Sequence, residues 1–151
     1  MAMTGVELVH VPYRGTAPAL TDLLAGEVQV LFDNLPGSIG HIRTGKVRAL
    51  GVTASKRVPS LPDVPTIGET VSGYEASVWY GMAAPKDTPP DVIETLNHAV
   101  NAVLAAPKLQ LRLGALGGEP MPMTPAEFGK LVAQETEKWA RVIRAANIKP
   151  E

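Results

Sequence analysis

The sequence predicts an α/β protein in which a lobe built on a small parallel sheet is followed by a helical segment. Strand and helix patterns alternate along residues 6–53, and this order requires parallel strands joined by right-handed crossovers. From residue 85 onward the apolar residues recur at helical spacing instead. The patterns therefore divide the chain into an α/β part and a helical part that begins at about Pro85.

The lobe is predicted to contain three strands and two intervening helices. Glycines that follow the last apolar residue of a helical pattern mark where each helix stops, at Gly26 and Gly45. The elements, in order, are a strand over residues 6–13, a helix over 16–25, a strand over 28–32, a helix over 36–44 and a strand over 46–53.

The rest of the chain predicts one β-segment and several helical elements after a proline-rich connection. Two Thr-x-x-Glu sequences have the spacing of a capping box, in which the threonine hydroxyl and the glutamate carboxylate satisfy helix N-terminal amides. The elements are a helical turn at Thr66–Glu69, a β-segment over 73–84, a helix that starts within Thr88–Asp91 and whose apolar stripe runs to Leu104, a short helix after Pro107 and a long helix after Thr124. The long helix places Trp139, Val142 and Ile143 on one apolar face, which needs a surface to cover it.

The segment around Gly15 is predicted to bind an anion. A strand ends at Tyr13 and a helix begins at Thr16, and the first amides of a helix lack partners and carry partial positive charge. A ligand carboxylate is therefore expected on the N–H groups of Gly15, Thr16 and Ala17. Threonine is also a common helix N-cap, so a well-capped connection explains the same residues. Nucleotide-binding loops are excluded because their Lys-Ser/Thr pair and further glycines are missing.

Asp33 and Asn34 lie where the second strand ends, at the edge where ligands collect in parallel sheets. They either cap the helix that follows or orient a polar ligand or a bridging water. An aspartate beside a bound carboxylate is repulsive unless a water, an amine or an ammonium lies between them. Asp33 therefore indicates either an amino group on the ligand or a structural role of its own.

Composition and spacing exclude several function classes. The net charge of −1 argues against nucleic acid as a partner, and the chain has no cysteine. The histidines show no metal-ligand spacing, and neither a serine-nucleophile motif nor a carboxylate pair is found, so we expect no catalytic residue, metal or cofactor. No apolar run is long enough for a membrane span, and the N-terminal sequence lacks a signal-peptide pattern. The chain as written is thus expected in the cytoplasm.

Four stretches of the sequence carry a resemblance to a known family. They are VPYRGTAPALTDLLAGEVQVLFDNLPGSIGHIRTGKVRALGVT, LPDVPTIGET, WYGMAAPKDTP and EFGKLVAQETEKWARVIRAANIK. Together they span nearly the whole chain, from Gly5 to Lys149. The chain resembles the carboxyl-terminal half of the periplasmic receptors of tripartite tricarboxylate transporters, also called Bug proteins.

The resemblance implies a two-lobed, periplasmic-binding-protein-like (Venus-flytrap) fold that binds a small organic acid without catalysis. The ligand classes it implies are dicarboxylates, amino acids and aromatic acids, and its partners are the membrane subunits of the transporter. It makes residues 5–80 the ligand-binding second lobe and residues 81–151 helices that pack on a first lobe, which is largely missing here. The ligand residues expected from the strand ends and the resemblance together are Tyr13, Gly15, Thr16, Ala17, Asp33 and Asn34.

The missing first lobe leaves an alternative function open. Apolar helix faces without a sheet to cover predict association with another protein surface. In this alternative the chain is an assembly module that dimerises through its C-terminal helix faces and no longer binds solute tightly. The resemblance to these receptors also implies a periplasmic location for the parent proteins.

Overall fold

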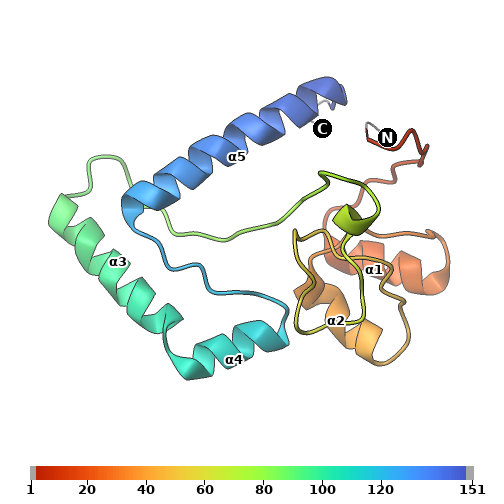
Figure 1. Ribbon diagram of the computed structural model, residues 1–151, viewed down its shortest axis with the longest axis horizontal. Coiled ribbons are helices and arrows are strands. Elements are labelled where there is room, and N and C mark those ends of the chain that lie inside the picture. Colours follow the sequence, from red (N-terminus) through yellow and green to blue (C-terminus); the bar gives the residue numbers. More distant parts are fainter. Residues whose placement is uncertain (1–2, 149–151) are drawn as a thin grey trace. The chain divides into compact units, whose positions relative to one another are not determined.

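A computed structural model describes residues 3–148 of the chain as two compact units. The first comprises residues 3–80 and 111–119, and the second comprises residues 81–110 and 120–148. Figure 1 labels the α-helices of the described residues. With the 3₁₀ helix η1, the helical elements are α1 (Thr16–Ala25), α2 (Leu35–Arg43), η1 (Ile67–Glu69), α3 (Pro90–Leu104), α4 (Pro107–Ala115) and α5 (Pro125–Ala145).

The helices of the first unit form where the sequence predicts them. α1 has the predicted bounds, and α2 begins and ends one residue earlier than predicted. Gly26 ends α1 in the left-handed conformation, with φ 83°, so that the N–H of Glu27 donates to the Asp22 carbonyl at 2.9 Å. Pro36 lies in the first turn of α2, where its missing N–H costs nothing.

The predicted strands of the first unit are not paired into a sheet within residues 3–148. One parallel bridge joins Val52 to Thr66, with the N–H of Val52 donating to the Pro65 carbonyl and the N–H of Ile67 donating to the Val52 carbonyl, both at 2.9 Å. The prediction of paired strands is therefore wrong for these residues. The segments concerned are residues 6–13, 28–32, 46–53 and the β-segment 73–84. An apolar pattern favours an extended chain, but a strand also needs a neighbour at hydrogen-bonding distance.

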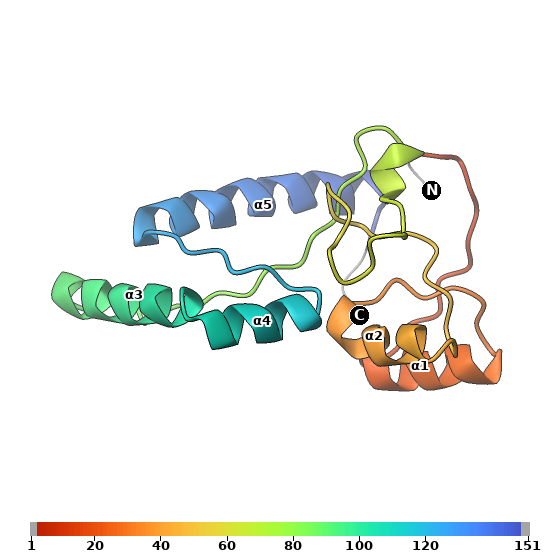
Figure 2. The same ribbon diagram turned by 60° about the horizontal axis from the view of Figure 1, so that its bottom comes forward.

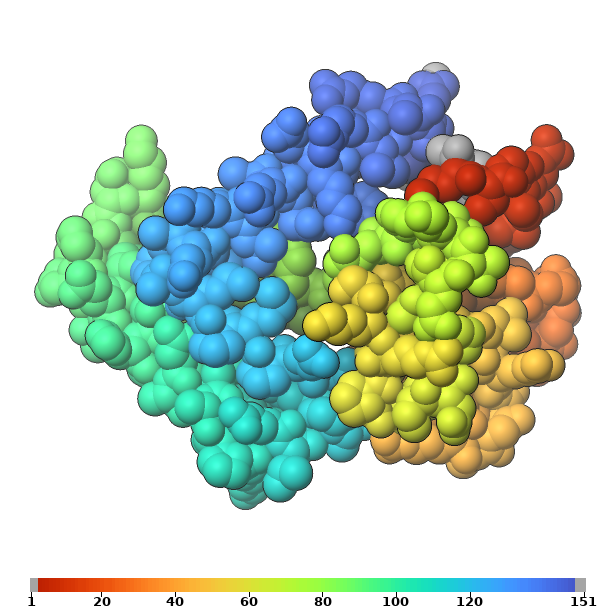
Figure 3. All heavy atoms as spheres, viewed as in Figure 1, coloured from red at the N-terminus to blue at the C-terminus, as the bar shows by residue number. Residues whose placement is uncertain are grey.

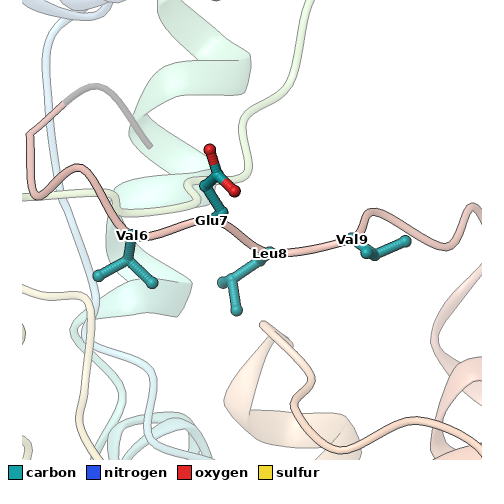
Figure 4. A pocket seen from close by; sticks show the side chains of 4 residues that line it. All are labelled: Val6, Glu7, Leu8 and Val9. Atoms are coloured by element: carbon teal, nitrogen blue, oxygen red, sulfur yellow. The ribbon is translucent and has the colours of Figure 1, made fainter.

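The first of these segments nevertheless keeps the side-chain alternation of a strand. Figure 4 shows Val6 and Leu8 on one side of the backbone and Glu7 on the other. Together with Val9, these residues line a shallow, open pocket. Val9 is 92% exposed, so the segment presents apolar side chains to its surroundings.

The second unit contains α3 and α5, which contact one another (Figure 2). The capping box predicted at the start of α5 is confirmed: Thr124 Oγ1 accepts from the N–H of Glu127 at 3.2 Å, and the glutamate carboxylate accepts from the N–H of Thr124 at 2.8 Å. The side-chain amides of Asn97 and Asn101 on α3 both donate to the Met123 carbonyl, at 2.8 and 3.1 Å. These bonds fix the residues that lead into α5 against α3.

The other predicted helices of the C-terminal segment and of the connection are confirmed as well. α3 begins at Pro90, within the predicted N-terminal signal Thr88–Asp91, and α4 begins at Pro107. The predicted turn at Thr66 forms as η1, with a complete capping box. α4 begins in the second unit and ends in the first, because residues 111–119 belong to the first unit.

Little apolar surface is buried among the described residues. The buried apolar side chains are Ala19 and Leu20 of α1 and Ile39 of α2, where these two helices contact one another. Many large apolar side chains are exposed instead, and Figure 3 shows the surface of α5 in blue. In the part of the chain with described coordinates, no helix is long and apolar enough to cross a bilayer.

Candidate ligand-binding site at the start of α1

Gly15 shapes the turn that leads into α1. It is the N-cap of the helix, with φ 152° and ψ 177°, a conformation that residues with a side chain rarely adopt. No side chain caps α1, and its first turn holds no acidic residue. The amides at the start of α1 are therefore not satisfied by a cap, and Gly15 and Ala17 are exposed.

The alternative in which Thr16 caps the helix is wrong. Thr16 is the first residue of α1, and its hydroxyl donates to Asp33 Oδ1 at 2.8 Å. The hydroxyl thus leaves the helix N-terminus and joins α1 to the residue that precedes Asn34, the N-cap of α2. The structure brings these two predicted site residues together, and both are half-buried.

Asp33 holds a second hydroxyl as well. The Ser38 hydroxyl, on the first turns of α2, donates to Asp33 Oδ2, and Ser38 is 8% exposed. A Cβ atom at Gly37 would lie 3.0 Å from Thr16 Cγ2 and 3.1 Å from Asp33 Oδ2, so a glycine is needed for this close approach. Of the two roles expected for Asp33, this geometry supports the structural one, because its carboxylate ties α1 to α2.

The remaining predicted residues lie differently. The Tyr13 hydroxyl donates to Asp22 Oδ2 at 2.7 Å, and this hydrogen bond to a carboxylate raises the pKa of the phenol above its ordinary value of 10. Asn34 is the N-cap residue of α2, but its side chain makes no capping bond. The Asn34 side chain therefore does not cap α2, contrary to the capping interpretation.

Sequence reasoning missed Ser38, Gly37 and Asp22. Ser38 lies five residues after Asp33, a separation that matches no capping motif, so the sequence carried no signal for this contact. Asp22 lies nine residues after Tyr13, within α1, whereas Tyr13 lies in the segment that precedes the helix. Both contacts depend on the relative placement of an extended segment and a helix.

A second cluster of polar groups lies outside this site, in the proline-rich connection. The Arg57 guanidinium donates to both carboxylate oxygens of Glu69, at 2.9 and 2.8 Å. This bidentate pairing, helped by the N–H of Thr66, lowers the pKa of Glu69 to about 2. Both side chains are exposed, so the pair clamps the connection rather than forming a binding site. A search of the described residues finds no group of side chains suited to hold a metal ion.

Comparison with known proteins decides the family. Residues 1–148 match the family model of the tripartite tricarboxylate transporter family receptor. The chain belongs to this receptor family. Its members are solute-binding receptors and not enzymes.

Curated relatives of the receptor chain differ in how much of their length it covers. A protein from the tcbD–tcbE intergenic region of Pseudomonas sp. strain P51 is 43% identical over 94% of this chain and 43% of its own length. Protein BugT of Bordetella pertussis is 37% identical over 97% of this chain and 45% of its own length. A protein from the clcB–clcD intergenic region of Pseudomonas knackmussii is 36% identical over 94% of this chain and 85% of its own length. The chain thus spans less than half of two of these relatives and most of the third.

Solved structures confirm the predicted periplasmic-binding-protein fold class. The R. palustris protein Rpa4515 with adipate matches with a TM-score of 0.90 and 40% identity, over 99% of this chain and 50% of that one. The periplasmic binding protein BugD matches with a TM-score of 0.85 and 40% identity, over 97% and 50%. MatC from Rhodopseudomonas palustris with bound malate matches with a TM-score of 0.80 and 32% identity, over 94% and 50%. The receptor chain therefore spans about half of each of these structures.

Proposed function

We propose that this chain binds a small organic carboxylate, without catalysis, as part of a tripartite tricarboxylate transport receptor. The observation that carries the proposal is the uncapped N-terminus of α1 behind Gly15, where backbone donors are left for an anion. The relatives described with adipate and with malate support a dicarboxylate as the ligand class.

In this proposal the N–H groups of Gly15, Thr16 and Ala17 donate to one ligand carboxylate. Tyr13 and Asn34 flank the carboxylate, and Asp33 holds the first residue of α1 in place through the 2.8 Å bond to its hydroxyl. The helix dipole contributes about 0.3–1 kcal/mol, and each hydrogen bond to a charged group contributes roughly 1.5–3 kcal/mol. The affinity therefore depends on several amides acting together.

The proposal extends to domain roles, location and partners. Residues 5–80 serve as the ligand-binding lobe, and residues 81–151 supply helices that pack on a further lobe of the receptor fold. The receptor works in the periplasm with the membrane subunits of its transporter. Support comes from the family match and from neighbours described as periplasmic proteins.

Calorimetric titration with adipate and malate tests the proposal, using two matched glycine variants. Gly15→Ala and Gly26→Ala both place a side chain at a positive φ, 152° and 83°, at opposite ends of α1, and neither Cβ meets an atom within 4 Å. Each change strains the backbone by roughly 1–3 kcal/mol. We expect Gly15→Ala to abolish binding and Gly26→Ala to retain it. Equal losses in both variants, or no binding by the unaltered chain, would contradict the proposal.

The exposed helix faces favour a second candidate, self-association without tight solute binding. On α5, Val132, Val142 and Ile143 are 38, 44 and 45% exposed. Apolar side chains exposed on a helix can promote association with another surface. Light scattering of the chain at micromolar concentration distinguishes the two candidates. A dimer that Ile143→Glu converts to a monomer supports assembly, whereas a monomer in the unaltered chain argues against it.

A further inference from the structure

We infer that the end of α2 and the segment after it form a basic face that binds an anionic phospholipid surface. The basic face consists of Arg43, Lys46 and Arg48, with the exposed Leu50 beside them. Contact with lipid concentrates the receptor at the membrane that holds its transporter subunits. This role rests on the proposed periplasmic location and partners, whereas the binding to lipid does not depend on the solute site.

Positive and negative charges are separated along the sequence. Residues 34–62 contain five of the 14 lysine and arginine residues and none of the 15 aspartate and glutamate residues. The net charge of −1 therefore conceals a basic stretch, which begins after Asp33 and ends before Asp63. A local excess of one sign attracts the opposite charge even when the whole molecule is nearly neutral.

Four of these five cations have no acidic partner within residues 3–148. All four are exposed, and the ion pairs of the described residues involve none of them; they are Arg43, Lys46, Arg48 and Lys56. Arg43 Nη2 donates to the Ala115 carbonyl at 3.2 Å, a neutral partner that leaves the charge of the guanidinium uncompensated. The dipole of α2 attracts cations only near its last turn, so it accounts for Arg43 but not for Arg48 or Lys56.

The turn after α2 keeps the first two cations of the basic face close in the chain. α2 ends at Arg43, and Gly45 takes the left-handed conformation, with φ 71°. The N–H of Lys46 donates to the His41 carbonyl at 2.9 Å, so Lys46 is held against the last turn of the helix. The basic face therefore begins on α2 itself and continues into the segment that follows.

Exposure alternates along that segment. Lys46, Arg48 and Leu50 are exposed, whereas Val47 and Ala49 between them are half-buried. The two cations and the leucine therefore share the solvent-facing side of the segment. Leu50 is 67% exposed, so a large apolar side chain stands beside the charges.

An anionic phospholipid layer suits both kinds of side chain. Its headgroup phosphates attract lysine and arginine, and apolar side chains enter the boundary between the headgroups and the acyl chains. A small anion such as phosphate engages the cations alone. The exposed Leu50 beside the cations therefore favours a lipid surface as the partner.

Sedimentation of the full chain with vesicles tests the inference. One set of vesicles contains equal parts of phosphatidylglycerol and phosphatidylcholine, and the other contains phosphatidylcholine alone. We expect binding to the anionic vesicles and little binding to the neutral ones. Binding should weaken as the salt concentration rises to 1 M, where the Debye length is about 3 Å.

Two double variants with the same change in charge locate the binding. Lys46→Gln with Arg48→Gln removes two cations of the basic face, and Lys130→Gln with Arg141→Gln removes two exposed cations of α5. We expect the first pair to weaken binding to anionic vesicles roughly 30-fold, at about fivefold per cation, and the second pair to leave it nearly unchanged. All four residues are exposed, so both variants should fold, which circular dichroism checks.

A third variant tests whether the partner is lipid and not merely an anion. Leu50→Ala keeps every charge and removes apolar surface, so we expect at least about threefold weaker binding to anionic vesicles. Its binding to polyglutamate, which has the charge but no apolar layer, should stay unchanged.

The outcomes distinguish this inference from the proposed function. Equal binding to both kinds of vesicle, or equal losses in the two double variants, would overturn the inference. Binding to polyglutamate but to neither kind of vesicle would also overturn it, and would indicate an acidic protein as the partner. None of these results bears on the titration with adipate and malate, so the proposed solute site stands or fails separately.

Discussion

Replacing Gly37 by alanine is expected to destabilise the first unit, whereas the same replacement at Gly40, on the same helix, stabilises it. Both glycines lie inside α2, where alanine is favoured over glycine by about 0.5–1 kcal/mol. Only at Gly37 does the new Cβ meet close neighbours, Thr16 Cγ2 at 3.0 Å and Asp33 Oδ2 at 3.1 Å; at Gly40 nothing lies within 4 Å.

The size of the effect follows from these two contributions. Forcing a methyl group into a tight contact costs about 1–3 kcal/mol. Gly40→Ala therefore gains about 0.5–1 kcal/mol, and Gly37→Ala falls about 1–3 kcal/mol below it because the helix-propensity term is shared. For a chain of this size, that difference corresponds to roughly 2–12 °C in Tm.

Thermal unfolding of the two variants, followed by circular dichroism, measures this difference directly. The propensity term cancels between the variants, so the comparison isolates the contact of Gly37 with Thr16 and Asp33. Gly37→Ala as stable as Gly40→Ala, or more stable, would refute the close approach on which the site geometry depends.

Three further changes have expected outcomes. The hydrogen bonds from Arg57 lower the pKa of Glu69 from 4.5 to about 2. The pair therefore stabilises the fold above pH 4.5, and this stabilisation is lost as the pH falls towards 2. We expect the Tm of Glu69→Gln to depend less on pH in that range than the Tm of the unaltered chain. Because the bond to Asp22 raises the pKa of Tyr13, the stabilisation from this bond is present below pH 10 and is lost at higher pH. Tyr13→Phe removes this bond and the corresponding ionisation from an absorbance titration. Thr124→Ala removes the cap of α5 and costs about 1 kcal/mol in denaturant unfolding, with Thr124→Ser as the conservative control.

Each of these expectations has a result that opposes it. If Glu69→Gln leaves the dependence of Tm on pH between 4.5 and 2 unchanged, the ion pair of Arg57 and Glu69 does not form in solution. An absorbance titration in which the phenol lost with Tyr13→Phe ionises at its ordinary pKa would exclude the bond from Tyr13 to Asp22. Equal stability of the alanine and serine variants at Thr124 would show that the capping box contributes nothing to α5.

The helices were predictable from the sequence because their signals are local. Proline in the first turn, a capping box or a terminal glycine lies within a few residues of the boundary it sets, and α1, α3 and α5 begin where such signals predict. Strand pairing was not predictable in the same way, since an extended segment such as residues 28–32 becomes a strand only when a distant segment pairs with it. The single bridge of Val52 to Thr66 shows how little of that pairing the described residues contain.

The candidate site was predictable in part, for a related reason. The strand-end rule singled out Tyr13 and Asp33, and the predicted helix N-terminus singled out Thr16. The structure joins Thr16 to Asp33 in one hydrogen bond. The capping role considered for Thr16 came from the frequency of threonine at helix N-caps, but the N-cap of α1 is Gly15. Ser38 was missed because its role arises from contact with Asp33 and not from its place in a motif.

The measurement that tests the central claim most directly is a nuclear magnetic resonance titration of the backbone amides with malate. The account predicts that the amide signals of Gly15, Thr16 and Ala17 shift most, in a saturable manner, because these N–H groups donate to the carboxylate. The signal of Gly26, at the opposite end of α1, should stay nearly unchanged. Shifts absent from the three amides, or spread evenly along the helix, would contradict a carboxylate site at the start of α1.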